Sequence, residues 1–214
     1  MEHSEIIERT TSFVRYTLVN AEGGHDWWHI YRVWSNAKKI AETEEADALV
    51  VELAALLHDI ADGKFHGGDE EIGPKTATNF LSALNIDRSV IIHVEQIIRW
   101  MSFKASFDQI NFHSKEFEIV QDADRLDAIG AIGIARAFSY GGYKGRAIYS
   151  PEIAPISDIT KEEYKNSTSP SINHFYEKLL ILKDKMHTLT AKAIAEQRHN
   201  FMELYLEQFY SEIK

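Results

Sequence analysis

The segment "EADALVVELAALLHDIAD", residues 45–62, places the strongest constraint on the fold. After Ala48 it is apolar on almost every side of a helical projection. A helix that is hydrophobic all round has to be enclosed by other elements. We therefore predict a central, buried helix over about residues 45–60, ended by the sequence "GKFHGG".

Apolar residues recur at helical spacing through most of the remaining chain. Four side chains are expected to cap helix N-termini: Ser4, Asp26, Asp87 and Ser114. The helix that follows Asp26 is predicted over about residues 27–42. Another helix is expected to start at Gly73-Pro74 and to run to about residue 84.

The second half of the chain is also predicted to be helical, with one interruption. The segment "VQDADRLDAIGAIGIARAF" is typical of one largely apolar helix, in which Gly130 and Gly133 permit close helix packing. Residues 140–170 have the composition of a long loop, and two amphipathic helices are expected after it, over about 171–185 and 187–210. Since strand-type alternation is scarce, the predicted fold is all-α.

Composition excludes several classes of function. The chain has 214 residues and a net charge of −10, so adhesion to nucleic acid polymers or to an anionic membrane is not expected. It has no cysteine, which excludes disulfides, thiolate zinc sites and cysteine nucleophiles. The N-terminus lacks the apolar segment of a secretion signal, and no apolar run reaches 18 residues. A cytoplasmic protein is therefore expected.

Several polar residues lie within otherwise apolar segments. His58 and Asp59 end the central helix, Asp122 and Asp124 precede another apolar segment, and His29 lies along the core side of its helix. A buried carboxylate needs a cation or several donors. Three helices can thus bring four of these residues to one point: His29, His58, Asp59 and Asp124. This set of two imidazoles and two carboxylates suits Mn²⁺, Fe²⁺, Co²⁺, Ni²⁺, Zn²⁺ or Mg²⁺.

Each of these residues has another interpretation when it is taken alone. A single histidine beside an apolar stripe is more often a hydrogen-bonded packing residue. The pair His58-Asp59 could be a helix C-terminus with a capping imidazolium, and Asp124 could be an N-cap. It is the combination that favours a metal site.

The order His29, His58-Asp59, Asp124 resembles the signature of the HD-domain superfamily of metal-dependent phosphohydrolases. The flanks "HDWWHIYRV", "LAALLHDIAD" and "QDADRLDAIGAIGIARAF" make it similar to the bacterial YedJ/YpgQ-like subgroup. The resemblance implies one HD-domain helical bundle over residues 1–214, with its metal-site core at about 20–140 and C-terminal helices at about 171–210. It also implies that the four residues bind one divalent metal, with manganese among the expected ions.

The resemblance further implies an activity and roles for other residues. The subgroup suggests hydrolysis of NTP or dNTP to a monophosphate and pyrophosphate by a metal-activated water. Asp62 would lie near the attacking water, and Lys64 follows it. Four further cations are candidates for binding substrate phosphate: Arg32, Lys144, Arg125 and Lys104.

Other residues are expected to support the site. Asp26, with His25, either caps a helix or supports the ligand histidines. Asp127 either accepts a hydrogen bond from a ligand histidine or pairs with a basic residue. Three histidines would permit a second metal if two of them converge: His66, His93 and His113.

Features outside the metal constellation also carry predictions. The glycines of "GGYKGR", residues 141–146, would suit a mobile lid. The tryptophans at 27, 28 and 34 are expected to be mostly core.

Two other functions compete with the phosphohydrolase. One is a di-iron oxygenase, because some HD-fold proteins have that activity, and it would need two metals and about six protein ligands. The other is a nucleotide-binding regulator that has lost catalysis. The leading hypothesis is an enzyme whose partner is a small phosphorylated molecule, with the chain acting alone or as a homodimer.

Overall fold

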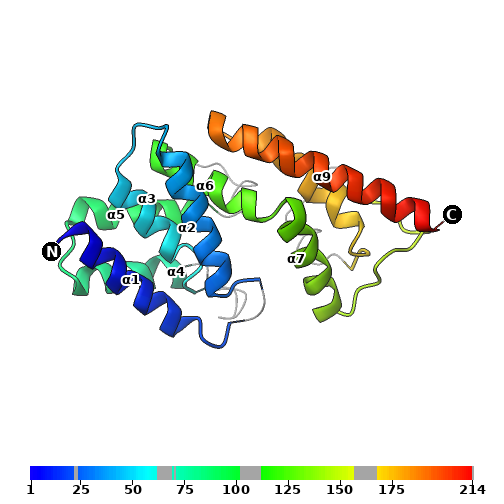
Figure 1. Cartoon of the computed structure of the whole chain (residues 1–214). Helices are drawn as coiled ribbons and strands as arrows, with labels where there is room; N and C mark the ends of the chain where they lie inside the picture. The colour runs from blue at the N-terminus through cyan, green and yellow to red at the C-terminus, as the bar shows by residue number, and fades with distance from the viewer. Residues whose placement is uncertain (22–23, 62–68, 70, 102–111, 157–167, 214) are drawn as a thin grey trace. The chain divides into compact units, whose positions relative to one another are not determined.

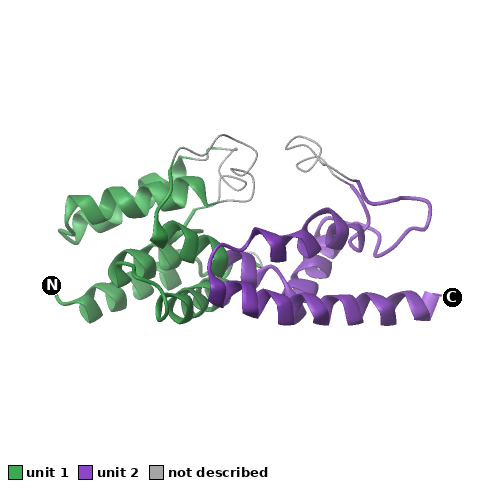
Figure 2. Cartoon of the chain, turned by 90° about the horizontal axis from the view of Figure 1, so that it is seen from above, with its two compact units in different colours: residues 1–123 green, residues 124–214 purple. Residues whose placement is uncertain are grey.

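The computed structural model describes residues 1–21, 24–61, 69, 71–101, 112–156 and 168–213. Every regular element within these ranges is helical, which confirms the predicted all-α class. No helix in the described ranges is both long and apolar enough to cross a bilayer. The chain divides into two compact units, Met1–Ala123 and Asp124–Lys214 (Figure 2). The prediction of a single domain over residues 1–214 stays a prediction.

The first unit is a cluster of helices around one central helix (Figure 1). Its helices are α1 His3–Thr17, α2 Trp27–Ala41, α3 Ala48–Leu57, α4 Ile72–Ala83, α5 Arg88–Trp100 and the first part of α6 Lys115–Asp127. Helix α3 packs against α1, α2 and α5, and α4 packs against α5. Nearly every residue of α3 from Val50 onward is buried, which confirms that the apolar segment is the centre of a core.

Several of these helices begin at a capping side chain that the sequence predicts. Asp26 accepts from the backbone N–H of His29, and Asp87 accepts from that of Ser89. The Ser114 hydroxyl accepts from the Phe117 N–H at the start of α6. The prediction for Ser4 was wrong, because α1 already begins at His3 and its N-cap residue makes no side-chain hydrogen bond.

A carboxylate from α6 holds the start of the central helix. Glu116 Oε1 accepts a hydrogen bond of 2.9 Å from the backbone N–H of Asp47, the residue that caps α3. Glu116 Oε2 lies 3.4 Å from His93 Nε2 on α5. Burial acts to raise the pKa of Glu116, but the hydrogen bonds from backbone N–H groups and the charge of His93 together hold the pKa below its ordinary value.

The lowered pKa of Glu116 predicts a pH-dependent contribution to stability. A carboxyl whose pKa is lower in the folded protein stabilises the fold at any pH above its pKa in the unfolded chain, here 4.5. This contribution is lost as the pH falls through the pKa of the folded state. The wild-type protein should therefore have a higher free energy of unfolding than Glu116→Gln at about pH 6, and this difference should disappear as the pH is lowered to about 3. Urea unfolding of both proteins across this range measures the difference. A difference that stays constant with pH would contradict the assignment.

The described residues of the second unit form the end of α6, α7 Gly130–Tyr143, two short helices and the long α9 Leu189–Ile213. Helix α9 packs against α7 and against the short helix Leu180–Lys185. The sequence predicts a regular amphipathic helix over 171–185, but the structure has a π-helical turn at Phe175–Leu179 followed directly by the 3₁₀ segment Leu180–Lys185. The prediction of regular helix there was wrong, since apolar spacing does not distinguish these three helix types.

The predicted loop excursion is confirmed over its described residues, although it starts later than residue 140. Helix α7 extends to Tyr143, and the chain from 144 to 156 is irregular. Backbone N–H groups of Ser171 and Ile172 donate to the carbonyls of Ala147 and Ile148, at 2.8 and 3.1 Å. These two bonds close the base of the excursion.

The apolar segment predicted as one helix is two helices. Helix α6 ends at Asp127, and α7 begins at Gly130, whose φ of +76° favours glycine. A Cβ on Gly130 would lie 3.0 Å from Arg198 Cβ on α9, so the glycine does permit the predicted close helix packing. The break itself was not predicted, because the apolar pattern continues across it without interruption.

The first glycines of "GGYKGR" do not form a loop. Gly141 and Gly142 lie in the last turn of α7, which corrects the prediction of a lid at these two positions. A Cβ on Gly141 would overlap the hydroxyl of Ser171, so this glycine permits the return of the chain after the excursion. Gly145, with φ of +65°, follows the helix end.

Candidate metal centre

Helix α2 places His29 in the interior of the first unit. The Asp26 carboxylate accepts a 3.0 Å hydrogen bond from the His29 backbone N–H, which fixes the first turn of the helix. The apolar face of α2, which includes Ile30 and Val33, is fully buried. His29 is on the same side, with 0 % of its surface exposed. A buried imidazole of this kind needs polar partners.

The residue that follows α3, His58, supplies a second imidazole. The chain leaves the helix after Leu57, and His58 Nδ1 lies 2.8 Å from the Ala55 carbonyl oxygen. Because a carbonyl can only accept, Nδ1 is the protonated nitrogen in this hydrogen bond. The neutral ring therefore presents an unprotonated Nε2, which is the form that binds a metal.

The three side chains converge on one point. His29 Nε2 lies 3.1 Å from His58 Nε2 and 3.7 Å from Asp59 Oδ2. Two ligand atoms about 2.1 Å from one ion, at angles of 90–110°, lie about 3.0–3.4 Å apart. Among the described residues, His29, His58 and Asp59 are the group that could hold a metal ion. The separation of the two imidazoles lies in this range and that of His29 and Asp59 lies about 0.3 Å beyond it, so the donor set fits a divalent metal after a small movement of the carboxylate.

Four of the other predicted site residues cannot be compared with this cluster. Asp62, Lys64 and Lys104 lie outside the described residues. Asp124 is half-buried in α6 and belongs to the second compact unit. Its role as a fourth ligand stays a prediction, as do the catalytic and phosphate-binding roles of the other three.

The other three predicted phosphate-binding residues lie within the described ranges, on three different segments of the chain. Arg32 is half-buried on α2, one helical turn after His29. Lys144 follows the end of α7, with its Nζ 5.2 Å from the centre of the Tyr143 ring. The Arg125 guanidinium donates to the Lys185 carbonyl and lies 3.0 Å from His187 Nε2. Within the second unit Arg125 therefore joins α6 to the chain before α9.

The structure shows one of the two interactions considered for Asp127. This buried carboxylate pairs with Arg136 Nη1 at 2.6 Å, so it has a basic partner from α7. His93 contacts the Ser114 hydroxyl at 2.8 Å, and His113, which is largely exposed, contacts Glu118 at 3.0 Å. Neither histidine belongs to the metal cluster of the described residues, and His66 lies outside those residues.

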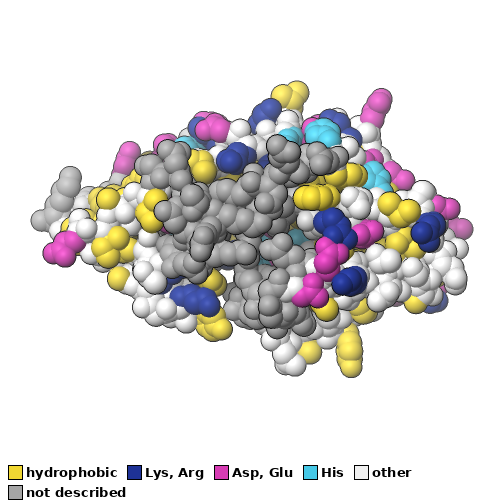
Figure 3. All heavy atoms as spheres, turned by 180° about the vertical axis from the view of Figure 1, so that it is seen from behind, with side chains coloured by type: hydrophobic (Ala, Val, Ile, Leu, Met, Phe, Trp, Pro, Cys, Tyr) yellow, Lys and Arg dark blue, Asp and Glu magenta, His cyan; other side chains and the backbone are white. Residues whose placement is uncertain are grey.

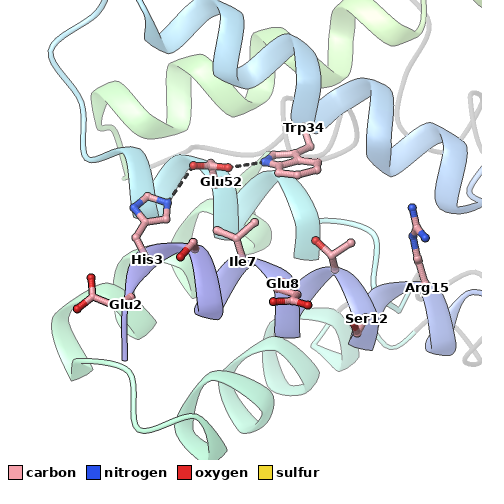
Figure 4. Close-up of a pocket in the computed structure, with 10 residues that line it drawn as sticks. Glu2, His3, Ile7, Glu8, Ser12, Arg15, Trp34 and Glu52 are labelled. Carbon is pink, nitrogen blue, oxygen red and sulfur yellow. Dashed lines mark hydrogen bonds and ion pairs between the residues drawn. The ribbon is translucent and has the colours of Figure 1, made fainter.

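The tryptophans of α2 are less buried than the sequence suggests. Trp28 is 60 % exposed, so the expectation that it is core was wrong. The half-buried Trp34 donates from Nε1 to Glu52 Oε2 at 2.8 Å, and His3 Nε2 lies 2.9 Å from the other oxygen of the same carboxylate. These residues line a groove of about 830 Å³ along α1 (Figure 4). The groove contains none of the metal-cluster residues.

One contact of the metal cluster was not specified by the sequence pattern. His25 Nε2 lies 3.8 Å from Asp59 Oδ2. His25 lies before the N-cap of α2, where helical periodicity does not apply. The sequence predicts that His25 either caps the helix or supports the ligand histidines, but it does not identify Asp59 as the partner of His25.

Charged side chains are mixed on the face shown in Figure 3. Several described Lys and Arg side chains lie next to Asp and Glu side chains there.

The fold and the cluster together define an all-helical protein with a candidate histidine–carboxylate metal site. The model of the family described as "HD domain" matches residues 27–129, a range that contains all three cluster residues. The Bacillus subtilis protein YpgQ is 38% identical over 100% of this chain and 96% of its own length. The chain therefore belongs to the HD-domain family.

Solved structures agree with this family. An HD-superfamily hydrolase from Bacillus thuringiensis is 44% identical, with a TM-score of 0.77 and coverage of 99% of this chain and 98% of its own. The crystal structure of Bacillus subtilis YpgQ in complex with ADP is 36% identical, with a TM-score of 0.79 and coverage of 99% and 97%. A Lactobacillus plantarum protein has a TM-score of 0.85 at 38% identity, covering 99% and 98%. The fold is thus that of HD-superfamily hydrolases.

Proposed function

We propose that this protein is a metal-dependent phosphohydrolase of small nucleotides, and specifically a nucleoside triphosphate pyrophosphohydrolase. The observation that carries the proposal is the convergence of His29, His58 and Asp59 at the end of the buried helix α3. The complex of the related YpgQ with ADP supports a nucleotide as the ligand. Cleavage between the α- and β-phosphates is the finer part of the proposal and rests on resemblance.

The protein's own residues supply position and charge for this reaction. His29 and His58 are held by α2 and by the end of α3, so both Nε2 atoms are oriented before any ligand arrives. Asp59 adds negative charge at the same point. When bound by these residues, a divalent cation supplies the Lewis acidity that phosphate hydrolysis needs near neutral pH.

Further residues complete the proposed site. In this proposal Asp124 is the fourth ligand, and Asp62 and Lys64 act beside the attacking water. Arg32 binds substrate phosphate, because charge-assisted hydrogen bonds from guanidinium groups suit phosphate oxygens. The same role is proposed for Lys104, Arg125 and Lys144.

A substrate panel tests the proposal. Purified protein is incubated with NTPs, dNTPs, monophosphates and cyclic dinucleotides, each with Mn²⁺, Co²⁺, Ni²⁺, Mg²⁺ or EDTA. We expect a triphosphate to give its monophosphate and pyrophosphate in equal amounts in the presence of metal, and no product in EDTA.

Each alternative outcome has a distinct meaning. Orthophosphate without pyrophosphate would overturn the pyrophosphohydrolase assignment, provided that contaminating pyrophosphatase is absent. Turnover that persists in EDTA would overturn the metal dependence. Nucleotide binding without turnover would favour a silent regulator, and two iron atoms per chain with consumption of O₂ would favour the oxygenase.

A further inference from the structure

We infer that His25 is a positioning residue that holds the Asp59 carboxylate for the metal through a contact between His25 Nε2 and Asp59 Oδ2. This inference rests on the proposed metal site. It gives a definite partner and role to His25, which lies four residues before His29 and outside the three-residue metal cluster.

The geometry places the Asp59 oxygen between two imidazoles. Oδ2 lies 3.7 Å from His29 Nε2 and 3.8 Å from His25 Nε2. The rings of His25 and His29 have their centres 6.1 Å apart and are inclined by 71°. The two rings thus approach the carboxylate from the same stretch of chain, one from within α2 and one from before its N-cap.

The contact between His25 and Asp59 lies mostly inside the protein rather than on its surface. The side chain of His25 is 21% exposed and that of Asp59 is 23% exposed, so each is mostly enclosed. His25 is separated from α2 by Asp26, whose carboxylate caps the helix, and this cap fixes where the chain enters the helix. The position of His25 is therefore set by a defined helix start.

Asp59 needs such a support because it lies beyond the end of α3. The helix ends at Leu57, and the Ile60 N–H donates to the Leu57 carbonyl in the turn that follows. The Asp59 side chain can adopt several staggered rotamers, and a neighbouring polar group favours one of them. A carboxylate offers about four lone-pair positions, so a contact with His25 leaves others for a cation.

His25 acts through Asp59 and not as another ligand. The ligand atoms of His29, His58 and Asp59 all lie within 4.8 Å of one another, and His25 is outside that group. Hydrogen-bonded partners of ligand carboxylates commonly change metal affinity by about 10–100-fold when they are removed. The separation of 3.8 Å between His25 Nε2 and Asp59 Oδ2 is longer than a hydrogen bond, and we expect it to shorten to one when a metal ion fixes the carboxylate.

The test is a titration of metal-free protein with Mn²⁺ by isothermal calorimetry, without substrate. We expect His25→Ala to weaken Mn²⁺ binding by about 10–100-fold, and His25→Gln, which keeps an N–H donor near the same place, to restore most of it. His3→Ala is the matched control, since His3 also contacts a carboxylate in the first unit, that of Glu52, away from the metal cluster. This control should bind Mn²⁺ as the wild type does.

A second measurement separates positioning from folding. Thermal unfolding of metal-free His25→Ala should match the wild type, whereas Asp26→Ala, which removes the helix cap, should unfold at lower temperature. The inference is overturned if His25→Ala leaves the Mn²⁺ affinity unchanged, or if His25→Gln binds as weakly as His25→Ala. Wild-type protein that binds Mn²⁺ but hydrolyses no nucleotide would refute the proposed function while leaving this inference intact.

Discussion

Replacing Asp59 by alanine should lower kcat/KM for the triphosphate by about 10³-fold, because metal-assisted charge stabilisation contributes several kcal/mol to such reactions. The substitution removes the carboxylate from the point where the Nε2 atoms of His29 and His58 lie 3.1 Å apart. Initial rates over a range of Mn²⁺ concentrations measure the effect. Excess Mn²⁺ should restore part of the rate if the loss comes from weaker metal binding.

Two matched variants make the result for Asp59 interpretable. Asp59→Asn keeps the size of the side chain and removes its charge, so it should behave like the alanine variant. Asp184→Ala removes an exposed aspartate in the second unit and should keep wild-type activity. An Asp59→Ala enzyme with wild-type turnover in EDTA would show that hydrolysis does not depend on a metal at this cluster.

Replacing Gly133 by alanine should destabilise the protein by about 2–3 kcal/mol, the cost of forcing an extra methyl group into a packed site. A Cβ at this position would overlap the carbonyl oxygen of Ala128, which is backbone and cannot rotate away. The turn between α6 and α7 would have to shift. Chemical denaturation followed by circular dichroism measures the change in the free energy of unfolding.

Gly142 provides the control for this prediction within the same helix. A Cβ on Gly142 would have no neighbour within 4 Å, and its backbone is helical. Gly142→Ala should therefore be neutral or stabilise the protein by about 0.5 kcal/mol, through the lower entropy of the unfolded chain. Equal effects of the two substitutions would mean that the glycine at 133 is not required by the turn.

Sequence reasoning predicted the parts of the fold that depend on local chemistry. Asp26, Asp87 and Ser114 cap helices as expected, since a capping side chain bonds to backbone only two or three residues away. The burial of α3 followed from its composition. The break before Gly130 was missed because apolar residues flank it on both sides, and the close approach of Arg198 to Gly130 is a contact distant in sequence.

The candidate site was predictable to a similar extent. His29, His58 and Asp59 were found because polar residues on apolar helices need partners, and the structure brings these three together. The contact between His25 and Asp59 joins residues on either side of a turn, so no periodic pattern encodes it. The tautomer of His58 was also not predictable, because it depends on where the Ala55 carbonyl points at the helix end.

That last hydrogen bond has a consequence for protein engineering. The final carbonyls of any α-helix have no partner within the helix. In this protein one of them, on Ala55, serves as the fixed acceptor for a histidine three residues later, so the backbone itself orients the ring. We therefore expect a histidine placed at the same position after another helix to have its ring oriented by the backbone, without a supporting side chain.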